Sequence, residues 1–253
     1  MKIEDRCFVI TGAGRGIGRA IAEDLARRGA RLALIEVSTE TLDEAVEACR
    51  TLGAEAQGYT ANVADETQVS DTFTSIHRDF GALHGLVNNA GILRDGLLLK
   101  AKEGQVKQKL SLEKWQAVID VNLTGTFLCG REAAAAMVEQ GEGGVIVNLS
   151  SVARAGNIGQ SNYSASKAGV AALVVCWARE LARYGIRVAG IAPGVFATEM
   201  VLSMKAEALE RLNSAVPLKR PGELQELADT VAFIIENDYV TGRILEVDGG
   251  IRM

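Results

Sequence analysis

Short apolar runs rich in valine, isoleucine and leucine alternate with longer amphipathic stretches along the whole chain. Seven of the runs fit buried strands, at 6–11, 31–36, 55–61, 83–88, 145–150, 187–192 and 243–247. Between them, stretches with helical spacing occur at 17–28, 40–52, 66–80, 112–139, 165–184 and 223–236. Strands separated by such helices pair in parallel, and right-handed crossovers place the helices on both faces of the sheet. The pattern predicts an α/β fold of three layers around a seven-stranded parallel sheet.

The length of the chain favours one large domain. Its 253 residues are 48% hydrophobic, which is enough to bury a large core. No repeat, low-complexity tract or linker marks an internal boundary. We therefore expect residues 1–253 to form a single domain.

Net charge and targeting signals exclude several classes of protein. There are 27 Lys and Arg residues against 32 Asp and Glu, a net charge of −5, so no cationic excess favours nucleic acid or an anionic membrane. The N-terminus lacks the pattern of a signal peptide, and no apolar run is long enough to span a bilayer. These features predict a soluble, cytoplasmic protein that binds neither nucleic acid nor membrane.

Cysteine and histidine spacing gives no indication of a metal site. The four cysteines are far apart in the sequence, which is typical of reduced and mostly buried thiols rather than of zinc ligands. His77 and His84 have no carboxylate or thiol pattern around them. We expect no bound metal.

A glycine-rich loop, TGAGRGIG at 11–18, follows the first predicted strand and opens the first predicted helix. Glycine permits a tight turn and a close approach of the backbone to a pyrophosphate, and a helix N-terminus adds unpaired N–H groups. The spacing differs from G-x-G-x-x-G, with three residues between the first and second key glycines and one before the third. The position predicts a Rossmann-type dinucleotide site formed by Gly12, Gly14, Arg15, Gly16, Ile17 and Gly18.

The residue that selects between the two nicotinamide dinucleotides is expected at the end of the second strand. Glu36 lies 20 residues beyond Gly16. A carboxylate there accepts hydrogen bonds from the adenosine ribose hydroxyls and repels a 2′-phosphate, which favours NAD(H). Arg15 opposes this preference, because its guanidinium can pair with that phosphate and admit NADP(H).

Two further segments lie outside these seven strands and six helical stretches. Residues 97–110 alternate around Glu103 and Gly104, which indicates a two-stranded hairpin with a local charge of +3. This hairpin is either a solvated surface ribbon or a lid that meets an anionic carrier of the substrate. Residues 199–219 have helical spacing and apolar side chains, which suit either a cover over an acyl substrate or a helix packed on the core.

Tyr163 and Lys167 are four residues apart at the start of a predicted helix, so both lie on one face. The other three tyrosines have no lysine at this offset. A neighbouring ammonium favours the phenolate and lowers the pKa of a tyrosine toward neutrality. The pair therefore predicts general acid–base chemistry at Tyr163.

Further motifs follow the glycine loop in a fixed order. They are NNAG at 88–91, VNLTG around Asn122, a serine at the end of the fifth strand, YSASK at 163–167 and PGVFAT at 193–198. From residue 6 to 250 the sequence resembles the short-chain dehydrogenase/reductase family. Within that family it is most similar to the bacterial 3-oxoacyl-acyl-carrier-protein reductases, especially at 156–169.

The resemblance implies roles for the catalytic residues. Tyr163 is the general acid in reduction and the base in oxidation, and Lys167 also holds the ribose hydroxyls of the nicotinamide. A serine orients the substrate carbonyl, and Asn122 either fixes a water in a proton chain or bonds only the backbone. Spacing from Tyr163 points to Ser150 as this serine, whereas alignment of the strand end points to Ser151.

The resemblance also implies contacts to the remainder of the cofactor. Asn62 and Val63 lie near the adenine, although the family usually has an aspartate in place of this asparagine. The adenosine and ribose side is lined by Asn89, Ala90 and Gly91. The carboxamide end of the nicotinamide is held by Pro193, Gly194, Val195 and Thr198.

These features predict an NAD(P)-dependent oxidoreductase that transfers a hydride between the cofactor and a carbonyl or secondary alcohol. The resemblance favours reduction of 3-oxoacyl thioesters, free or carrier-bound, in fatty acid biosynthesis, by a homotetramer. One alternative is an NAD-dependent secondary-alcohol dehydrogenase with another substrate, which Glu36 favours. Another is a non-catalytic dinucleotide sensor, against which the intact Tyr163 and Lys167 argue.

Overall fold

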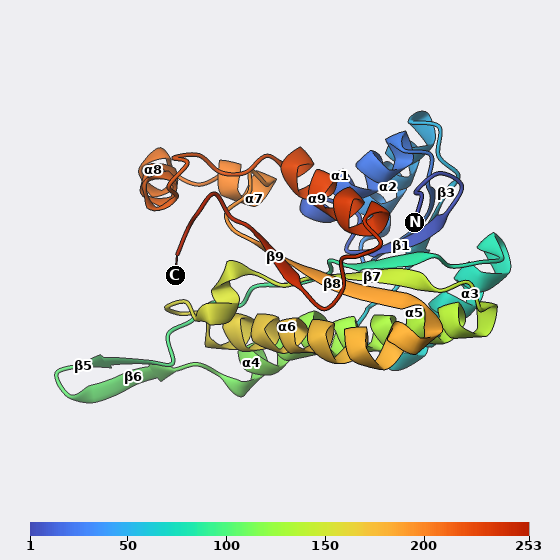
Figure 1. The fold of residues 1–253 in the computed structure, drawn as a ribbon. Coiled ribbons are helices and arrows are strands. Elements are labelled where there is room, and N and C mark those ends of the chain that lie inside the picture. Colours follow the sequence, from blue (N-terminus) through green and yellow to red (C-terminus); the bar gives the residue numbers. More distant parts are fainter. Residues whose placement is uncertain (253) are drawn as a thin grey trace.

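The computed structural model describes residues 1–252 and contains the predicted parallel sheet (Figure 1). The strand order is β3-β2-β1-β4-β7-β8-β9, and every neighbouring pair is parallel. These strands are β1 (Cys7–Thr11), β2 (Arg31–Glu36), β3 (Ala56–Thr60), β4 (Gly85–Asn88), β7 (Gly144–Leu149), β8 (Ile186–Pro193) and β9 (Ile244–Val247). The predicted α/β fold class is thereby confirmed.

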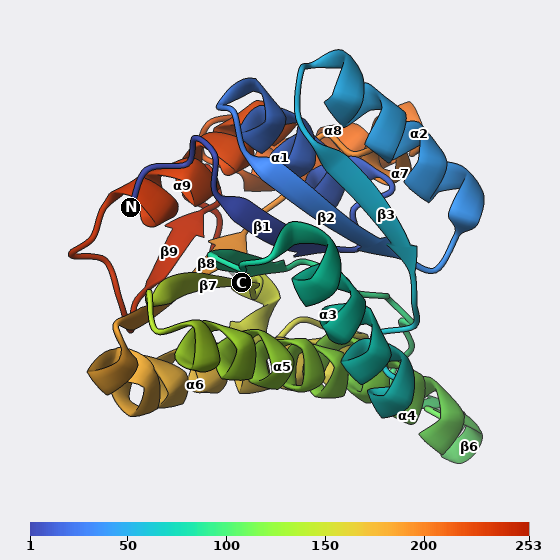
Figure 2. The same ribbon diagram turned by 90° about the vertical axis from the view of Figure 1, so that its right-hand side faces the viewer.

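Helices cover both faces of the sheet, which buries its apolar strands on each side (Figure 2). One apolar core joins the sheet to α1 (Gly16–Arg27), α2 (Thr39–Thr51) and α9 (Leu224–Glu236). The other core joins it to α3 (Glu66–Phe80), α5 (Gly125–Gln140) and α6 (Ser161–Leu181). Strand order reverses between β1 and β4, which places a crevice at the carboxyl ends of these strands, where open α/β sheets bind ligands.

Three predicted helices differ from those in the structure. The stretch at 112–139 is interrupted, because α4 (Leu112–Ile119) passes through a π-helical turn at Asp120–Thr124 before α5 begins. The helix predicted from 165 begins at Ser161 as α6, so it includes Tyr163. The segment 199–219 contains two short helices, α7 (Glu199–Leu202) and α8 (Ala206–Ala215), and α7 begins after the side-chain cap of Thr198.

Residues 99–109 form an antiparallel hairpin that projects from the body of the molecule (Figure 1). Its strands, β5 (Leu99–Lys102) and β6 (Gln105–Lys109), are exposed along their whole length. Glu103 and Gly104 make the turn with φ values of +54° and +75°, and such a pair of left-handed residues matches the twist of a tight hairpin.

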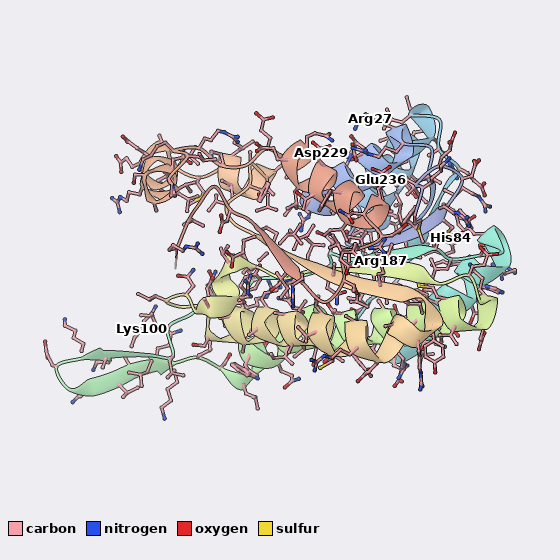
Figure 3. The ribbon with its side chains drawn as sticks, viewed as in Figure 1. Arg27, His84, Lys100, Arg187, Asp229 and Glu236 are labelled. Carbon is pink, nitrogen blue, oxygen red and sulfur yellow. The ribbon has the colours of Figure 1, made fainter. Side chains whose placement is uncertain are left out.

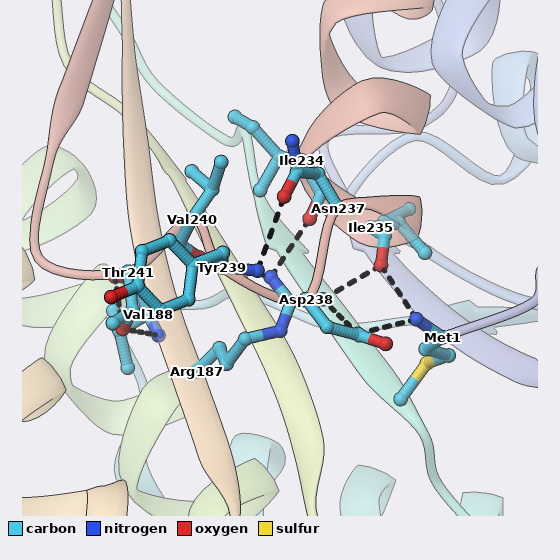
Figure 4. Close-up of polar contacts among 10 residues, drawn as sticks. All are labelled: Met1, Arg187, Val188, Ile234, Ile235, Asn237, Asp238, Tyr239, Val240 and Thr241. Atoms are coloured by element: carbon cyan, nitrogen blue, oxygen red, sulfur yellow. Dashed lines mark hydrogen bonds and ion pairs between the residues drawn. The ribbon is translucent and has the colours of Figure 1, made fainter.

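The side chain of Arg187, in β8, binds backbone carbonyl oxygens at the C-terminal end of α9 (Figure 4). Its guanidinium donates to the carbonyl oxygens of Ile234 at 2.8 Å, Ile235 at 2.6 Å and Val240 at 3.0 Å. These carbonyls lie at or beyond the helix end, where no further turn supplies N–H donors. The contact anchors the end of α9 to β8, the strand next to the β9 edge of the sheet.

No helix within residues 1–252 is long and apolar enough to cross a membrane.

Candidate active site

Backbone conformation or close packing requires the glycines of the loop between β1 and α1. Gly12 and Gly16 have φ values of +64° and +56°, which only glycine adopts readily. A Cβ on Gly14 would lie 2.5 Å from Thr41 Oγ1, and one on Gly18 would lie 2.1 Å from the Gly12 carbonyl oxygen. Between them, Ile17 packs against the core. The loop therefore presents bare backbone at the carboxyl edge of β1.

The N-terminus of α1 has the properties of an anion site. Arg15 occupies the N-cap position, no side chain caps the helix, and the first turn contains no acidic residue. Its first N–H groups and the positive end of its dipole are thus left for a ligand. This arrangement, together with the bare backbone of the loop, fits a pyrophosphate.

Asn89 and Thr11 connect the glycine loop to the segment after β4. The Asn89 amide donates to the carbonyl oxygens of Thr11 at 3.0 Å and Gly12 at 2.9 Å. The Thr11 hydroxyl accepts from the backbone N–H groups of Asn89 and Ala90, both at 3.1 Å. These bonds hold the two predicted cofactor-binding loops side by side. The loops are so close that a Cβ on Gly12 would lie only 2.8 Å from Ala90 Cα.

Replacement of Gly18 by alanine tests the packing of this loop. Because the added Cβ would meet the Gly12 carbonyl and the Asn89 amide at 2.1 and 2.5 Å, we expect Gly18→Ala to lower the free energy of unfolding by about 2–3 kcal/mol. Urea denaturation measures the change. Glu47→Ala on the exposed face of α2 is the control, with a change within about 0.5 kcal/mol. Equal stability of the two variants would contradict the close approach.

Glu36 lies at the end of β2 with its carboxylate directed at the glycine loop. One carboxylate oxygen accepts from the Gly14 N–H at 3.2 Å, and the other accepts from the Val37 N–H at 2.8 Å. The structure thus brings Glu36 to the loop, as the 20-residue spacing predicts. The exposed Arg15 begins α1 from the same loop.

The residues predicted near the adenine differ in accessibility. Asn62 is exposed, and its side-chain oxygen accepts from the Ala64 N–H at 3.0 Å. Val63 is buried against α5, where a Cβ on Gly125 would lie 2.7 Å from its side chain. Only the side chain of Asn62 is therefore accessible to a ligand, because the side chain of Val63 packs in the interior.

The segment after β8 approaches the glycine loop at Gly16. Pro193 is the last residue of β8, and the Gly194 N–H donates to the Val247 carbonyl at 2.9 Å. Thr198 caps α7, and its methyl group lies 3.8 Å from the position of a Cβ on Gly16. Val195 lies between them in the sequence. These predicted contacts for the nicotinamide end therefore line the same sheet edge as the glycine loop.

Asn122 is completely buried in the π-helical turn between α4 and α5. Its side-chain oxygen accepts from the Ile92 N–H at 2.8 Å, and its amide donates to the Ile92 carbonyl at 3.1 Å. The amide also donates to the Ser166 hydroxyl at 3.3 Å. A Cβ on Gly91 would lie 3.3 Å from the same amide oxygen. Asn122 thus joins the NNAG segment to α6, and π-helical turns of this kind are frequent at functional sites.

The two adjacent serines after β7 have different partners. The Ser150 hydroxyl donates to the backbone carbonyl of Lys167 at 2.8 Å. The Ser151 hydroxyl accepts from the Ala153 N–H at 3.1 Å and is hydrogen-bonded to the phenol of Tyr163. Only the second serine therefore faces the predicted acid–base residue.

Tyr163 and Lys167 lie on one face of α6, as their spacing predicts. The Lys167 ammonium donates to the Leu149 carbonyl at 2.6 Å and lies 5.7 Å from the centre of the Tyr163 ring. Burial lowers the pKa of this ammonium to about 8. Burial also raises the pKa of Tyr163, and the Ser151 hydrogen bond opposes the rise. In this geometry the Lys167 ammonium is directed at the Leu149 carbonyl rather than at the phenol.

Asn162 is a buried residue of the site that the sequence patterns did not identify. Its amide donates to the carbonyl oxygens of Arg94 and Lys114, both at 3.0 Å, and its side-chain oxygen accepts from the Tyr163 N–H at 2.9 Å. The side chain is 0% exposed. Its position immediately before Tyr163 was the available signal, but the predicted helix began three residues too late to include it.

Asp95 is a second residue that the patterns did not single out. Its carboxylate accepts from the Gln160 amide at 3.1 Å, in the loop that precedes α6. The negative charge contributes to the raised pKa of Tyr163. A carboxylate at the rim thereby favours the protonated phenol.

His84, one of the two histidines, has a structural position beside the sheet. Its Nδ1 accepts from the Cys7 N–H at 3.1 Å, and burial lowers the pKa of the imidazole. His77 lies in the last turn of α3. Over residues 1–252, no three His, Cys, Asp or Glu side chains gather as metal ligands.

Comparisons with known proteins agree with this geometry. Residues 12–252 match the family model described as enoyl-(acyl carrier protein) reductase. A 3-oxoacyl-acyl-carrier-protein reductase of Thermotoga maritima is 39% identical over 254 residues, which cover 99% of each chain. The protein of the same name from Staphylococcus aureus is 41% identical over 249 residues, which cover 97% of each chain.

Among solved structures, a candidate gluconate dehydrogenase of Agrobacterium tumefaciens superposes with a TM-score of 0.90 at 33% identity. The match covers 99% of this chain and 97% of that one. The nearly complete coverage confirms the resemblance that the motifs indicated and implies an enzyme with a nicotinamide cofactor. The chain therefore belongs to the short-chain dehydrogenase/reductase family of oxidoreductases.

Proposed function

We propose that the protein reduces 3-oxoacyl thioesters to 3-hydroxyacyl thioesters in fatty acid biosynthesis. The observation that carries the proposal is the group formed by Ser151, Tyr163 and Lys167 at the sheet edge next to the glycine loop. The names of the Thermotoga and Staphylococcus relatives support the substrate class.

In this proposal the bound nicotinamide supplies a hydride to the carbonyl carbon, and the protein's own residues manage the proton and the geometry. Tyr163 donates its phenolic proton to the carbonyl oxygen as negative charge develops there. Ser151 donates a hydrogen bond to the same oxygen and thereby orients the substrate. The Lys167 ammonium stabilises the phenolate that remains, once the ammonium is directed toward it.

Asn122 and Asn162 act on this group through the backbone. Asn122 holds the NNAG segment against α6, and its proposed part in the proton chain rests on that position. Asn162 fixes the backbone of Tyr163 by accepting from its N–H. Because Asn162 bonds the backbone of Tyr163 rather than its phenol, we treat it as a positioning residue.

The cofactor is proposed to lie across the carboxyl edge of β1, β4 and β8. The uncapped N-terminus of α1 and the bare glycine backbone hold the pyrophosphate, and Lys167 holds the nicotinamide ribose. Asn62 and Val63 lie at the adenine, Asn89, Ala90 and Gly91 line the ribose side, and the segment Pro193 to Thr198 holds the carboxamide. The fixed glycine loop and the open helix N-terminus support this placement.

We propose that Glu36 makes NAD(H) the preferred cofactor, by several-fold over NADP(H). Its carboxylate is held at the loop by the N–H groups of Gly14 and Val37, where it accepts from ribose hydroxyls and repels a 2′-phosphate. Glu36→Gln is expected to remove the preference, and Arg15→Ala to lower the use of NADP(H) further. Side-by-side steady-state kinetics with both cofactors measures this, with Glu40→Gln as control. Turnover with NADPH equal to or better than with NADH in the wild type would contradict the assignment.

The whole chain is proposed to act as one dinucleotide-binding and catalytic domain, in which α7 and α8 cover the acyl group. Leu202 and Met204 are exposed there, at 59% and 41%, and provide apolar surface. Met200, in the same segment, lies outside the side chains that the structure describes.

A homotetramer in the cytoplasm is the proposed working form. Phe127 and Val175, on α5 and α6, are each 43% exposed, and apolar side chains on the outer faces of these long helices suit subunit contacts. The four cysteines are unpaired, which suits a reducing compartment. Light scattering at micromolar concentration tests the assembly, and a monomer would contradict it.

The second candidate function is an NAD-dependent secondary-alcohol dehydrogenase. The position of Glu36 favours it, and the structural likeness to a candidate gluconate dehydrogenase agrees. A steady-state screen of acetoacetyl thioesters and simple secondary alcohols, each with both cofactors, separates the two functions. Preferential reduction of the thioesters supports the first proposal, and preferential oxidation of alcohols with NAD supports the second.

A further inference from the structure

The hairpin and its flanks, residues 97–110, form an arm that no step of the proposed chemistry uses. We call this segment the basic arm. It extends away from α4 and α6 (Figure 1). Apolar side chains on it are exposed to solvent, with Leu98 at 68%, Leu99 at 50% and Val106 at 52%. A two-stranded hairpin is marginally stable by itself, and exposed apolar side chains gathered on one element are typical of an interaction surface.

The charge of the arm is opposite to that of the remainder of the chain. Four lysines and Glu103 give the arm a charge of +3, while the whole chain carries −5. Lys102 lies 4.0 Å from Glu103. Among the described residues, no carboxylate lies within ion-pair distance of Lys100, Lys109 or the nearby Lys114. An acidic surface would neutralise these ammonium groups without breaking an existing pair.

The three unpaired lysines meet at the base of the arm. A hollow of about 140 Å³ there is lined by Lys100, Lys109 and Lys114, together with Asp95, Ser111 and neighbouring backbone. Figure 3 shows Lys100 where the arm joins the body. Three cations against the one carboxylate of Asp95 leave a positive potential at that point.

The base of the arm is attached to the loop that precedes Tyr163. Gly96 pairs with Gln160 in an isolated parallel bridge, and its N–H donates to the Gly159 carbonyl at 2.8 Å. Asn162 binds the carbonyl oxygens of Arg94 and Lys114, which lie before and after the arm. The arm therefore stands at the rim of the proposed active site, where a protein that delivers substrate has to approach.

We propose that the basic arm docks the acidic surface of the protein that carries the acyl thioester. The inference rests on the proposed function, since only carrier-bound substrate needs such a contact. Its lysines steer the carrier to the rim, and Leu98, Leu99 and Val106 provide the apolar part of the contact. The attachment beside Tyr163, rather than on the outer faces of α5 and α6, favours a substrate carrier over a second copy of this chain.

Charge reversal in the arm tests the proposal. Lys100→Glu/Lys109→Glu is compared with Lys2→Glu/Arg243→Glu, which changes the net charge equally at exposed positions outside the arm. Reduction of acetoacetyl groups is measured on acyl carrier protein and on N-acetylcysteamine, a small thioester with no carrier. We expect the arm variant to lose about tenfold or more in kcat/KM with carrier-bound substrate only, as loss of electrostatic steering predicts. The control variant keeps wild-type values with both substrates.

A direct binding measurement separates failure of this inference from failure of the proposed function. Calorimetry with acyl carrier protein that bears no acyl group needs no turnover, so weaker binding by the arm variant supports docking even if the enzyme acts on other substrates. Equal carrier affinity and equal kcat/KM in the arm variant and the wild type would overturn the proposal. A changed oligomeric state of the arm variant in light scattering, with unchanged carrier affinity, would also overturn it and assign the arm to a second copy of the chain.

Discussion

Tyr163→Phe is expected to lower kcat by at least about 10³-fold, toward the upper part of the range for loss of a general acid. The substitution removes only the phenolic oxygen, so the ring keeps its packing on α6 and the Lys167 contact to Leu149 is unaffected. Cofactor affinity should therefore stay within a few-fold of the wild type. Stopped-flow or steady-state kinetics gives the turnover, and fluorescence titration with NADH gives the affinity.

Tyr239→Phe is the matched control for this experiment. Tyr239 is 99% exposed and follows α9, far along the chain from the site (Figure 4). We expect wild-type kinetics from this variant. Residual activity of Tyr163→Phe above one tenth of the wild type would contradict the acid role. A wild-type protein that binds NADH but turns over no ketone or alcohol would instead support the dinucleotide sensor.

The two serines after β7 should differ sharply when each is replaced. Ser151→Ala is expected to lower kcat/KM by about 10²-fold or more, because it removes a hydrogen-bond donor to the carbonyl oxygen in the transition state. Ser150→Ala is expected to keep activity within a few-fold. It should cost about 1 kcal/mol of stability instead, since the substitution removes the buried hydrogen bond from its hydroxyl to the Lys167 carbonyl.

Kinetics and thermal unfolding of both serine variants measure these effects together. A dead Ser150→Ala enzyme beside an active Ser151→Ala enzyme would reverse the assignment. Equal, wild-type activity of both variants would remove the serine from the mechanism. Ser150→Thr, which retains a hydroxyl, controls for the loss of the bond to Lys167.

The fold was predictable because its determinants are local and periodic. Valine, isoleucine and leucine runs buried on both faces identify parallel strands without knowledge of their partners, and the strand bounds agree with the predicted ones to within two residues at every end. The glycine loop was predictable for a similar reason, since Gly12, Gly16 and Gly18 are required by backbone geometry. The alternation around Glu103 and Gly104 also indicated the hairpin correctly.

The details of the site depend on contacts that spacing does not encode. The π-helical turn at Asn122 adds one residue to a helical turn, and the amphipathic pattern of 112–139 continues across it without a break. Ser150 and Ser151 are adjacent buried serines, and only their different partners on α6, the Lys167 carbonyl and the Tyr163 phenol, separate them. The raised pKa of Tyr163 follows from burial and from the charge of Asp95, neither of which the four-residue spacing to Lys167 encodes.

The hydrogen bonds of Asn162 have a consequence for how this protein can diversify. One amide group binds the carbonyl oxygens of both Arg94 and Lys114, so the chain leaves and re-enters the body at nearly the same point. A loop with adjacent ends can be lengthened, shortened or exchanged at little entropic cost, and the change does not shift the register of the framework. The segment between Arg94 and Lys114, which contains the basic arm, can thus change its binding partner during evolution without altering the catalytic residues next to it.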